Sequence, residues 1–201
     1  MSHHVRLASL VGVALLGAAG TAFAQSAPGG ASPPPERIGW EFGAGLYGGE
    51  INCENQDGEF CNGVTEAGGI DLHVNYFFKP TLGLYFDVFP MVHKENDWTF
   101  THNVVTAGLK WRPAPIFTFT GGIGSAQAKL SYNRILGIEA KSDAVPAILL
   151  AAAVEVLRGK TFALDLQARV GVGFYDEDDD NDGQADIVGR NVGFGAAMTW
   201  F

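Results

Sequence analysis

Charged residues and cysteines are both scarce in this sequence of 201 residues. Charged side chains make up 17%, less than the roughly one quarter that is usual, which disfavours a disordered polyelectrolyte and an ordinary soluble helical domain. Two cysteines are too few for a zinc ribbon or a small disulfide-stapled domain. With 13 lysines and arginines against 22 aspartates and glutamates, the net charge is −9, which disfavours nucleic acid as a partner. Glycine is abundant instead, with 27 residues.

Residues 1–24 predict a secretory signal peptide. A basic start that includes Arg6 precedes an apolar stretch over 7–19, and Ala22-Phe23-Ala24 has the small residues of a cleavage site. A membrane anchor is the alternative, but the apolar stretch is short for a helix that crosses a bilayer, which takes about 20 residues. Residues 25–36, rich in Pro, Gly and Ser, predict a flexible periplasmic leader. The folded domain is therefore expected over 37–201.

From Arg37 onward, apolar and polar residues alternate with a period of two, which predicts strands with one apolar and one polar face. In one clear example, Leu164 and Leu166 fall on one side while Asp165 and Gln167 fall on the other. The eight predicted strands cover 38–47, 70–79, 82–91, 100–112, 116–125, 144–157, 162–175 and 190–201. The stretch 147–157 is rich in helix formers, so a helix is the alternative there, although it is too short to span a bilayer.

The predicted connections alternate between short and long, as in an outer-membrane barrel. Short turns are expected at 79–81, 112–115 and 158–160, and long loops at 50–66, 92–99, 126–143 and 176–189. With eight strands, this order places both chain ends in the periplasm and the long loops outside the cell. A soluble β-sandwich has no reason to follow this rule.

The two faces of the strands also favour a barrel in lipid. A narrow barrel turns its apolar face to the lipid and fills its lumen with small or polar side chains, and its closure leaves no unpaired strand edge in hydrocarbon. The sequence therefore predicts an all-β, eight-stranded antiparallel transmembrane β-barrel, with aromatic girdles near the strand ends. The girdle candidates are Trp40, Trp98, Trp111 and Trp200.

The predicted lumen contains a set of ionisable residues. Because an unpaired buried charge is costly, we expect them to pair with one another in a structural network, although the spacing does not assign the pairs. The set comprises Glu41, Asp71, His73, Asp87, Lys110, Arg112, Glu155, Asp165 and Arg169.

The last residues carry the features of a known family. The segment GFGAAMTWF is a glycine-containing amphipathic strand that ends on the aromatic Phe201. Over residues 37–201 the chain resembles the small eight-stranded outer-membrane proteins of the OmpA and OmpX type, in which the outer-membrane assembly machinery reads such a C-terminal strand. Where this family often has Gly and an aromatic residue, the chain has Ala196 and Thr199; a frame shifted by one uses Gly195, Met198 and Trp200. The resemblance implies an outer-membrane location in contact with lipid and lipopolysaccharide.

An acidic segment over 176–186 matches the oxygen-ligand positions of an EF-hand-type calcium loop. Position 12 of the loop is Gly189 rather than a bidentate glutamate, and the flanks are strands. Two interpretations stay open: a weak calcium site, or a solvated acidic loop that contacts cations held by lipopolysaccharide. No other cofactor is expected. The candidate ligands are Asp178, Asp180, Asp182, Gln184 through its backbone carbonyl, and Asp186.

Cys53 and Cys61 lie in the first long loop and face an oxidising compartment, so we expect a disulfide between them. Catalytic use is disfavoured because the two cysteines have no CxxC spacing.

The expected function is structural or in surface interaction, by a monomer without a continuous pore. A small-solute or ion channel is one alternative, because a glycine-rich lumen could hold water. A lipid A-modifying enzyme is the other; it needs a Ser/His/acid constellation at the lipid edge, for which His102 is the nearest candidate. No Ser lies beside His102, so no enzyme activity is expected.

Overall fold

The computed structural model describes residues 37–55, 65–132, 138–175 and 187–201. Within these ranges all regular structure is β-strand, and no helix there is long and apolar enough to cross a membrane. The strands are β1 (Gly39–Asn55), β2 (Thr65–Lys79), β3 (Leu82–Glu95), β4 (Trp98–Ala114), β5 (Phe117–Tyr132), β6 (Ile138–Lys141), β7 (Val145–Arg158), β8 (Phe162–Tyr175) and β9 (Ile187–Trp200).

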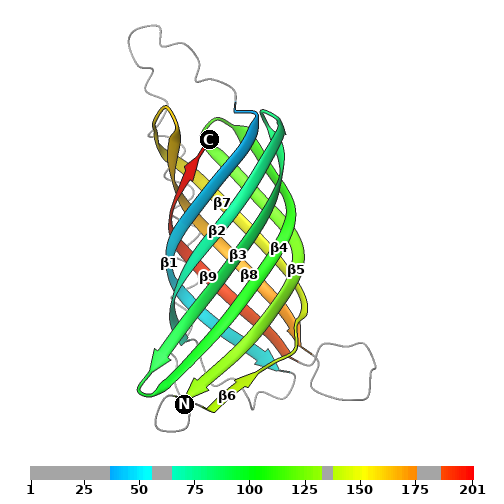
Figure 1. The fold of residues 1–201 in the computed structure, drawn as a ribbon, viewed down its shortest axis with the longest axis vertical. Coiled ribbons are helices and arrows are strands. Elements are labelled where there is room, and N and C mark those ends of the chain that lie inside the picture. The colour runs from blue at the N-terminus through cyan, green and yellow to red at the C-terminus, as the bar shows by residue number, and fades with distance from the viewer. Residues whose placement is uncertain (1–36, 56–64, 133–137, 176–186) are drawn as a thin grey trace, which may run out of the picture. The chain divides into compact units, whose positions relative to one another are not determined.

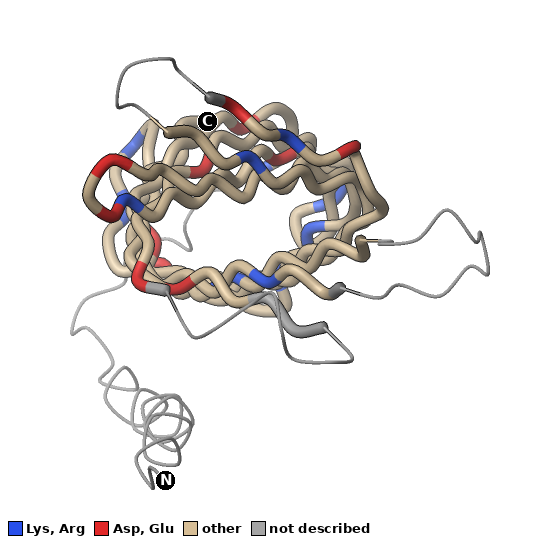
Figure 2. Tube along the Cα trace, turned by 90° about the horizontal axis from the view of Figure 1, so that it is seen from below, with Lys and Arg blue, Asp and Glu red and all other residues tan. Residues whose placement is uncertain are grey.

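Eight of these strands close into an antiparallel barrel (Figures 1 and 2). Consecutive barrel strands are neighbours, β5 pairs with β7, and the pairing of β1 with β9 completes the ring. The short β6 pairs only with the end of β5. The predicted eight-stranded antiparallel barrel is thus confirmed, and 147–157 lies in strand β7 rather than in a helix.

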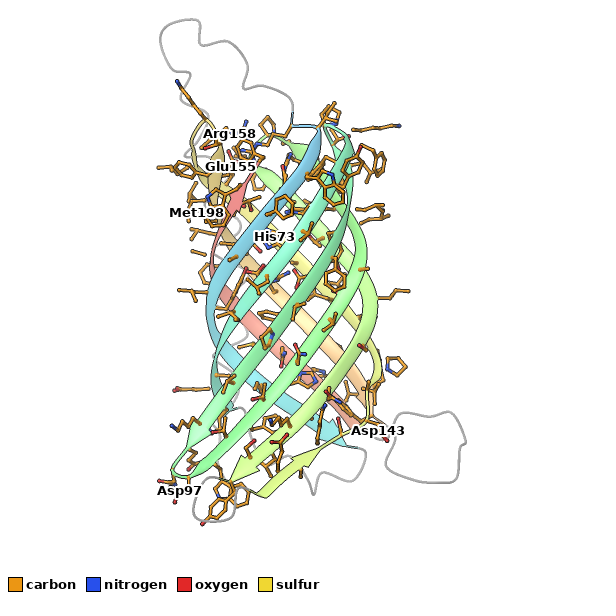
Figure 3. All side chains as sticks on the ribbon, viewed as in Figure 1. His73, Asp97, Asp143, Glu155, Arg158 and Met198 are labelled. Atoms are coloured by element: carbon orange, nitrogen blue, oxygen red, sulfur yellow. The ribbon has the colours of Figure 1, made fainter. Side chains whose placement is uncertain are left out.

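The two ends of the barrel differ in their connections. Tight turns join β2 to β3, β4 to β5 and β7 to β8 at one end, here called the turn end, and each strand pair has a register shift there. Glu155 and Arg158 lie at this end, whereas Asp97 and Asp143 lie at the opposite end, here called the loop end (Figure 3).

The predicted long loop over 92–99 is wrong, and the other three predicted loops are too long. They include the ends of β1, β2, β5 and β9, and the loop predicted over 126–143 also contains β6. Residues 92–99 continue β3 and β4 up to a tight turn at Asn96 and Asp97, where Asn96 has a φ of 51°. The extension was missed because Thr99, Thr101 and Asn103 face outward as polar residues, so apolar alternation stops before the strands do.

The outward face of the barrel is apolar over most of its height. Phe42, Leu46, Phe86, Leu150 and Phe194 are each at least half exposed, although they are large hydrophobic residues. A continuous apolar surface of this kind is unfavourable in water and suits contact with lipid.

Candidate functional site

The barrel interior is filled with side chains and is the candidate functional site. Eight of the nine predicted lumen residues line one interior cavity of about 20 Å³, and the ninth, Asp71, is fully buried beside them. A cavity of this size holds about one water molecule. Tyr85, Gln167 and Thr199 also line it and are not in the predicted set, which comprised acidic and basic residues, although Gln167 shares a face with Asp165 in the sequence.

An ionic cluster from three strands lies at the centre of the lumen. Arg169 of β8 is 3% exposed; its guanidinium lies 3.0 Å from a carboxylate oxygen of Asp71 in β2 and donates a hydrogen bond to Asp87 in β3. His73 contacts Asp71 through Nδ1, and its Nε2 lies 3.2 Å from the Thr199 hydroxyl. Arg169 therefore links strands on opposite sides of the barrel. The spacing of these residues in the sequence could not assign these ion pairs.

Glycines on β1 make room for this cluster. A Cβ atom on Gly45 would lie 2.2 Å from Asp71 Oδ1, and one on Gly43 would lie 2.1 Å from His73 Nε2. Both distances are shorter than non-bonded atoms tolerate. The glycine-rich face of the lumen therefore accommodates large side chains from neighbouring strands.

Asp71, His73 and Asp87 also offer three ligand atoms within 4.8 Å of one another, which could hold a metal ion. However, Arg169 already places its positive charge against both carboxylates. A divalent cation would be repelled by that guanidinium, so the donor set fits the arginine rather than a metal.

A second ionic cluster closes the turn end. Arg112 donates to Glu41 at 3.1 Å, and Arg37 donates to Glu155 at 2.7 Å. Arg158 also donates to Glu155, and the Arg37 guanidinium lies 3.8 Å from the centre of the Phe201 ring. Arg37, which precedes β1, therefore contacts Phe201, which follows β9.

An apolar layer lies in the lumen on the loop-end side of the central ionic cluster. Tyr47, Phe89, Met91, Val104 and Leu149 are buried in one cluster, and the Tyr47 and Phe89 rings meet edge to face with centroids 5.3 Å apart. This layer was not predicted, because the lumen was expected to hold small or polar side chains, although Phe89 and Met91 share the inward face of β3 with Asp87.

His102 lies inside the barrel and not at the lipid edge. It is 1% exposed, its Nδ1 lies 2.7 Å from Asn191 Oδ1, and the Asn191 amide donates to the His102 carbonyl oxygen at 3.0 Å. This placement contradicts the arrangement that a lipid-modifying enzyme would need from His102.

The C-terminal residues occupy distinct positions. Met198 and Trp200 point outward and are 36% and 46% exposed, whereas Thr199 is buried in the lumen. A Cβ on Gly195 would lie 2.0 Å from the Leu46 carbonyl oxygen, so the close approach of β9 to β1 requires glycine there. Phe201 follows the strand and packs under Arg37. The outward aromatic at the strand end is therefore Trp200, as in the shifted frame.

Two further candidate sites lie outside the described residues. All five candidate calcium ligands, from Asp178 to Asp186, fall in the undescribed range 176–186. Cys61 also falls outside, while the backbone of Cys53 pairs with Gly189 in the β1–β9 ladder. The calcium site and the disulfide stay predictions.

No protein-family model matches this chain, and no curated protein matches it in sequence. Among solved structures, its fold is that of the small eight-stranded outer-membrane β-barrels, so the predicted resemblance is confirmed at the level of fold.

Two of these structures are particularly similar. Neisserial surface protein A is 10% identical over 80% of this chain and 96% of that chain, with a TM-score of 0.55. Ail, the attachment invasion locus protein of Yersinia pestis, is 16% identical over 82% of this chain and 100% of that chain, with a TM-score of 0.53.

Proposed function

We propose that the chain is an integral outer-membrane protein with a closed lumen, and that its role is structural or in surface interaction. The observation that carries this proposal is the combination of an apolar outer face with an interior whose cavity measures about 20 Å³. Lipid covers the outer face, and the ion pairs and the apolar cluster block the path along the axis.

In this proposal the turn end faces the periplasm and the loop end faces the outside of the cell. Short turns on the periplasmic side are the rule for bacterial outer-membrane barrels. All three connections at the turn end, after β2, β4 and β7, are tight, whereas at the loop end only the connection between β3 and β4 is as short. The partners are membrane lipid, lipopolysaccharide and the assembly machinery, which would read the outward Met198 and Trp200 of β9. The barrel needs no second copy to close its sheet, which supports a monomer.

Conductance of the purified full chain in planar bilayers tests the closed lumen. We expect no discrete openings from the native protein, and openings from a variant that removes two inward side chains, Phe89→Ala with Leu149→Ala. The matched control, Phe86→Ala with Leu150→Ala, removes side chains that are 50% and 60% exposed on the lipid face and should stay silent. Openings from the native protein would contradict the closed lumen and would favour the alternative function, a small-solute or ion channel.

We assign no catalytic role, a choice that the inward position of His102 supports. Incubation of the purified protein with radiolabelled lipopolysaccharide should leave the lipid unchanged. Release of labelled acyl chains would contradict this part of the proposal.

A further inference from the structure

A pair of aromatic residues lies at the far loop end of the barrel. Trp98 of β4 is directly opposite Tyr132 of β5, and their ring centroids are 4.4 Å apart with an interplanar angle of 38°. Trp98 is 45% exposed. The two rings, together with Asn96 and Asp97 in the adjacent turn, line an open hollow of about 370 Å³. Figure 3 shows Asp97 at this extremity.

This pair lies too far out to belong to a membrane girdle. Trp111, near the turn end, and Trp98 are both on β4, and their separation along the barrel axis is roughly 33 Å at about 3.3 Å per residue and a tilt of about 40°. The apolar band of such barrels is about 25 Å tall, with the girdles at its two edges. Trp98 also lies on the inward face of β4, which it shares with His102 and Val104, whereas Trp111 faces outward. The outward residues of β4 also become polar toward the loop end, where Val105 is followed by Asn103, Thr101 and Thr99. Trp98 is therefore exposed above the lipid.

The chemistry of the hollow suits a sugar. A pyranose ring presents C–H groups on its faces, which pack on the faces of indole and phenol rings, and hydroxyl groups on its rim. Asp97 contributes carboxylate oxygens and Asn96 an amide, and both types of group bond to adjacent hydroxyls. Trp and Tyr are also the residues that provide large contact areas at little cost in conformational entropy.

The charge around the hollow favours neutral sugars over anionic sugars. Within the described β3–β4 hairpin tip, Asp97 lies in the lining of the hollow, the side chain of Glu95 beside the turn is 75% exposed, and Lys94 is the lysine. Together with a chain charge of −9, this arrangement disfavours sulfated or phosphorylated saccharides.

We propose that the hollow formed by Asn96, Asp97, Trp98 and Tyr132, here called the tip site, binds neutral saccharide. This inference rests on the proposed surface-interaction function and names the ligand class. The sugar is either part of the lipopolysaccharide of the same membrane or a glycan from outside; the chemistry recognised is the same.

Fluorine NMR of the full chain labelled with 5-fluorotryptophan tests the tip site. The chain has four tryptophans, so the Trp98 signal is assigned from a Trp98→Phe variant. In phospholipid nanodiscs without lipopolysaccharide, titration with maltotriose, a β-linked galactotriose and triacetylchitotriose should shift the Trp98 signal saturably with at least one of them. The signals of Trp40, Trp111 and Trp200 should stay in place, and sucrose octasulfate should have no effect.

Variants separate the tip site from general effects. Asp97→Ala should weaken the binding of the active trisaccharide at least about tenfold, whereas Thr101→Ala, outward on the same hairpin, should leave it unchanged. Heat-modifiable gel mobility confirms that each variant is folded. Absence of any saturable shift with all three neutral sugars, or a shift with sucrose octasulfate alone, would overturn the proposal.

The same measurement in nanodiscs that contain lipopolysaccharide distinguishes the two sources of sugar. If lipopolysaccharide occupies the tip site, the Trp98 signal is already shifted and soluble trisaccharide moves it no further; if the ligand is an external glycan, the titration is unchanged. Because binding in nanodiscs does not depend on whether the lumen conducts or which end faces outward, its failure is distinguishable from failure of the proposed function.

Discussion

At the scale of single residues, the inward glycines of β1 decide where large side chains fit. A Cβ on Gly45 would meet Asp71 Oδ1, whereas one on Gly48, in the same strand, would meet nothing within 4 Å. Gly45→Ala should lower the free energy of unfolding by about 1–3 kcal/mol through overpacking. Gly48→Ala should be neutral or slightly stabilising, because alanine restricts the unfolded chain. Urea unfolding in phospholipid vesicles measures both; equal effects would contradict the assigned role of Gly45.

Arg169 neutralises two buried carboxylates, so its removal should be costly. Arg169→Met leaves Asp71 and Asp87 buried without a cation, and we expect a loss of about 3–5 kcal/mol in the free energy of unfolding. The same unfolding assay provides the measurement.

Two further variants control this experiment. Adding Asp71→Asn and Asp87→Asn to Arg169→Met should restore much of the stability, because no uncompensated charge is then buried. Lys129→Met removes the exposed ion pair with Glu139, whose atoms are 2.8 Å apart, and should cost at most about 1 kcal/mol. A small loss for Arg169→Met, comparable with that for Lys129→Met, would show that the central cluster is not stabilising.

At the scale of strands, β4 presents two environments along one outward face. Ala107 lies in the apolar part of the strand, and Thr101 lies near the loop end. Ala107→Arg should destabilise the barrel in phospholipid by about 2–4 kcal/mol, because it places a cation near the middle of the bilayer, and Thr101→Arg by about 0–1 kcal/mol. Equal losses for the two variants in a vesicle unfolding assay would contradict the position of the lipid band on β4.

The strand scale is also where prediction from the sequence succeeded best. Alternation located the eight barrel strands, since side chains on a strand point to opposite faces and one face here contacts lipid. It missed the extensions of several strands toward the loop end. On β3 and β4 these extensions carry outward polar residues such as Lys94, Thr99 and Thr101. It also missed the short β6, whose four residues are too few to show a period.

At the scale of the whole molecule, the sequence predicted which charges face inward but not how they pair. Arg169 and Asp87 are 82 positions apart and meet across the lumen. Their contact depends on the register of every strand pair between them, which a single sequence does not specify. The apolar layer around Phe89 and Leu149 was missed although Phe89 shares a face with Asp87. The lumen was expected to hold only small or polar side chains, and the sequence does not show that large apolar side chains from several strands meet at one level.

The membrane location that we propose requires the apolar face of the barrel to contact lipid. Quenching of tryptophan fluorescence by brominated acyl chains tests it directly, in four variants of the full chain that each keep one tryptophan and carry phenylalanine at the other three positions. Trp40, Trp111, Trp200 and Trp98 are 62%, 52%, 46% and 45% exposed, so exposure alone does not distinguish Trp98 from Trp200. We expect strong quenching of Trp40, Trp111 and Trp200 and none of Trp98. Equal quenching of all four, or quenching of none, would show that the apolar face does not lie in lipid as proposed.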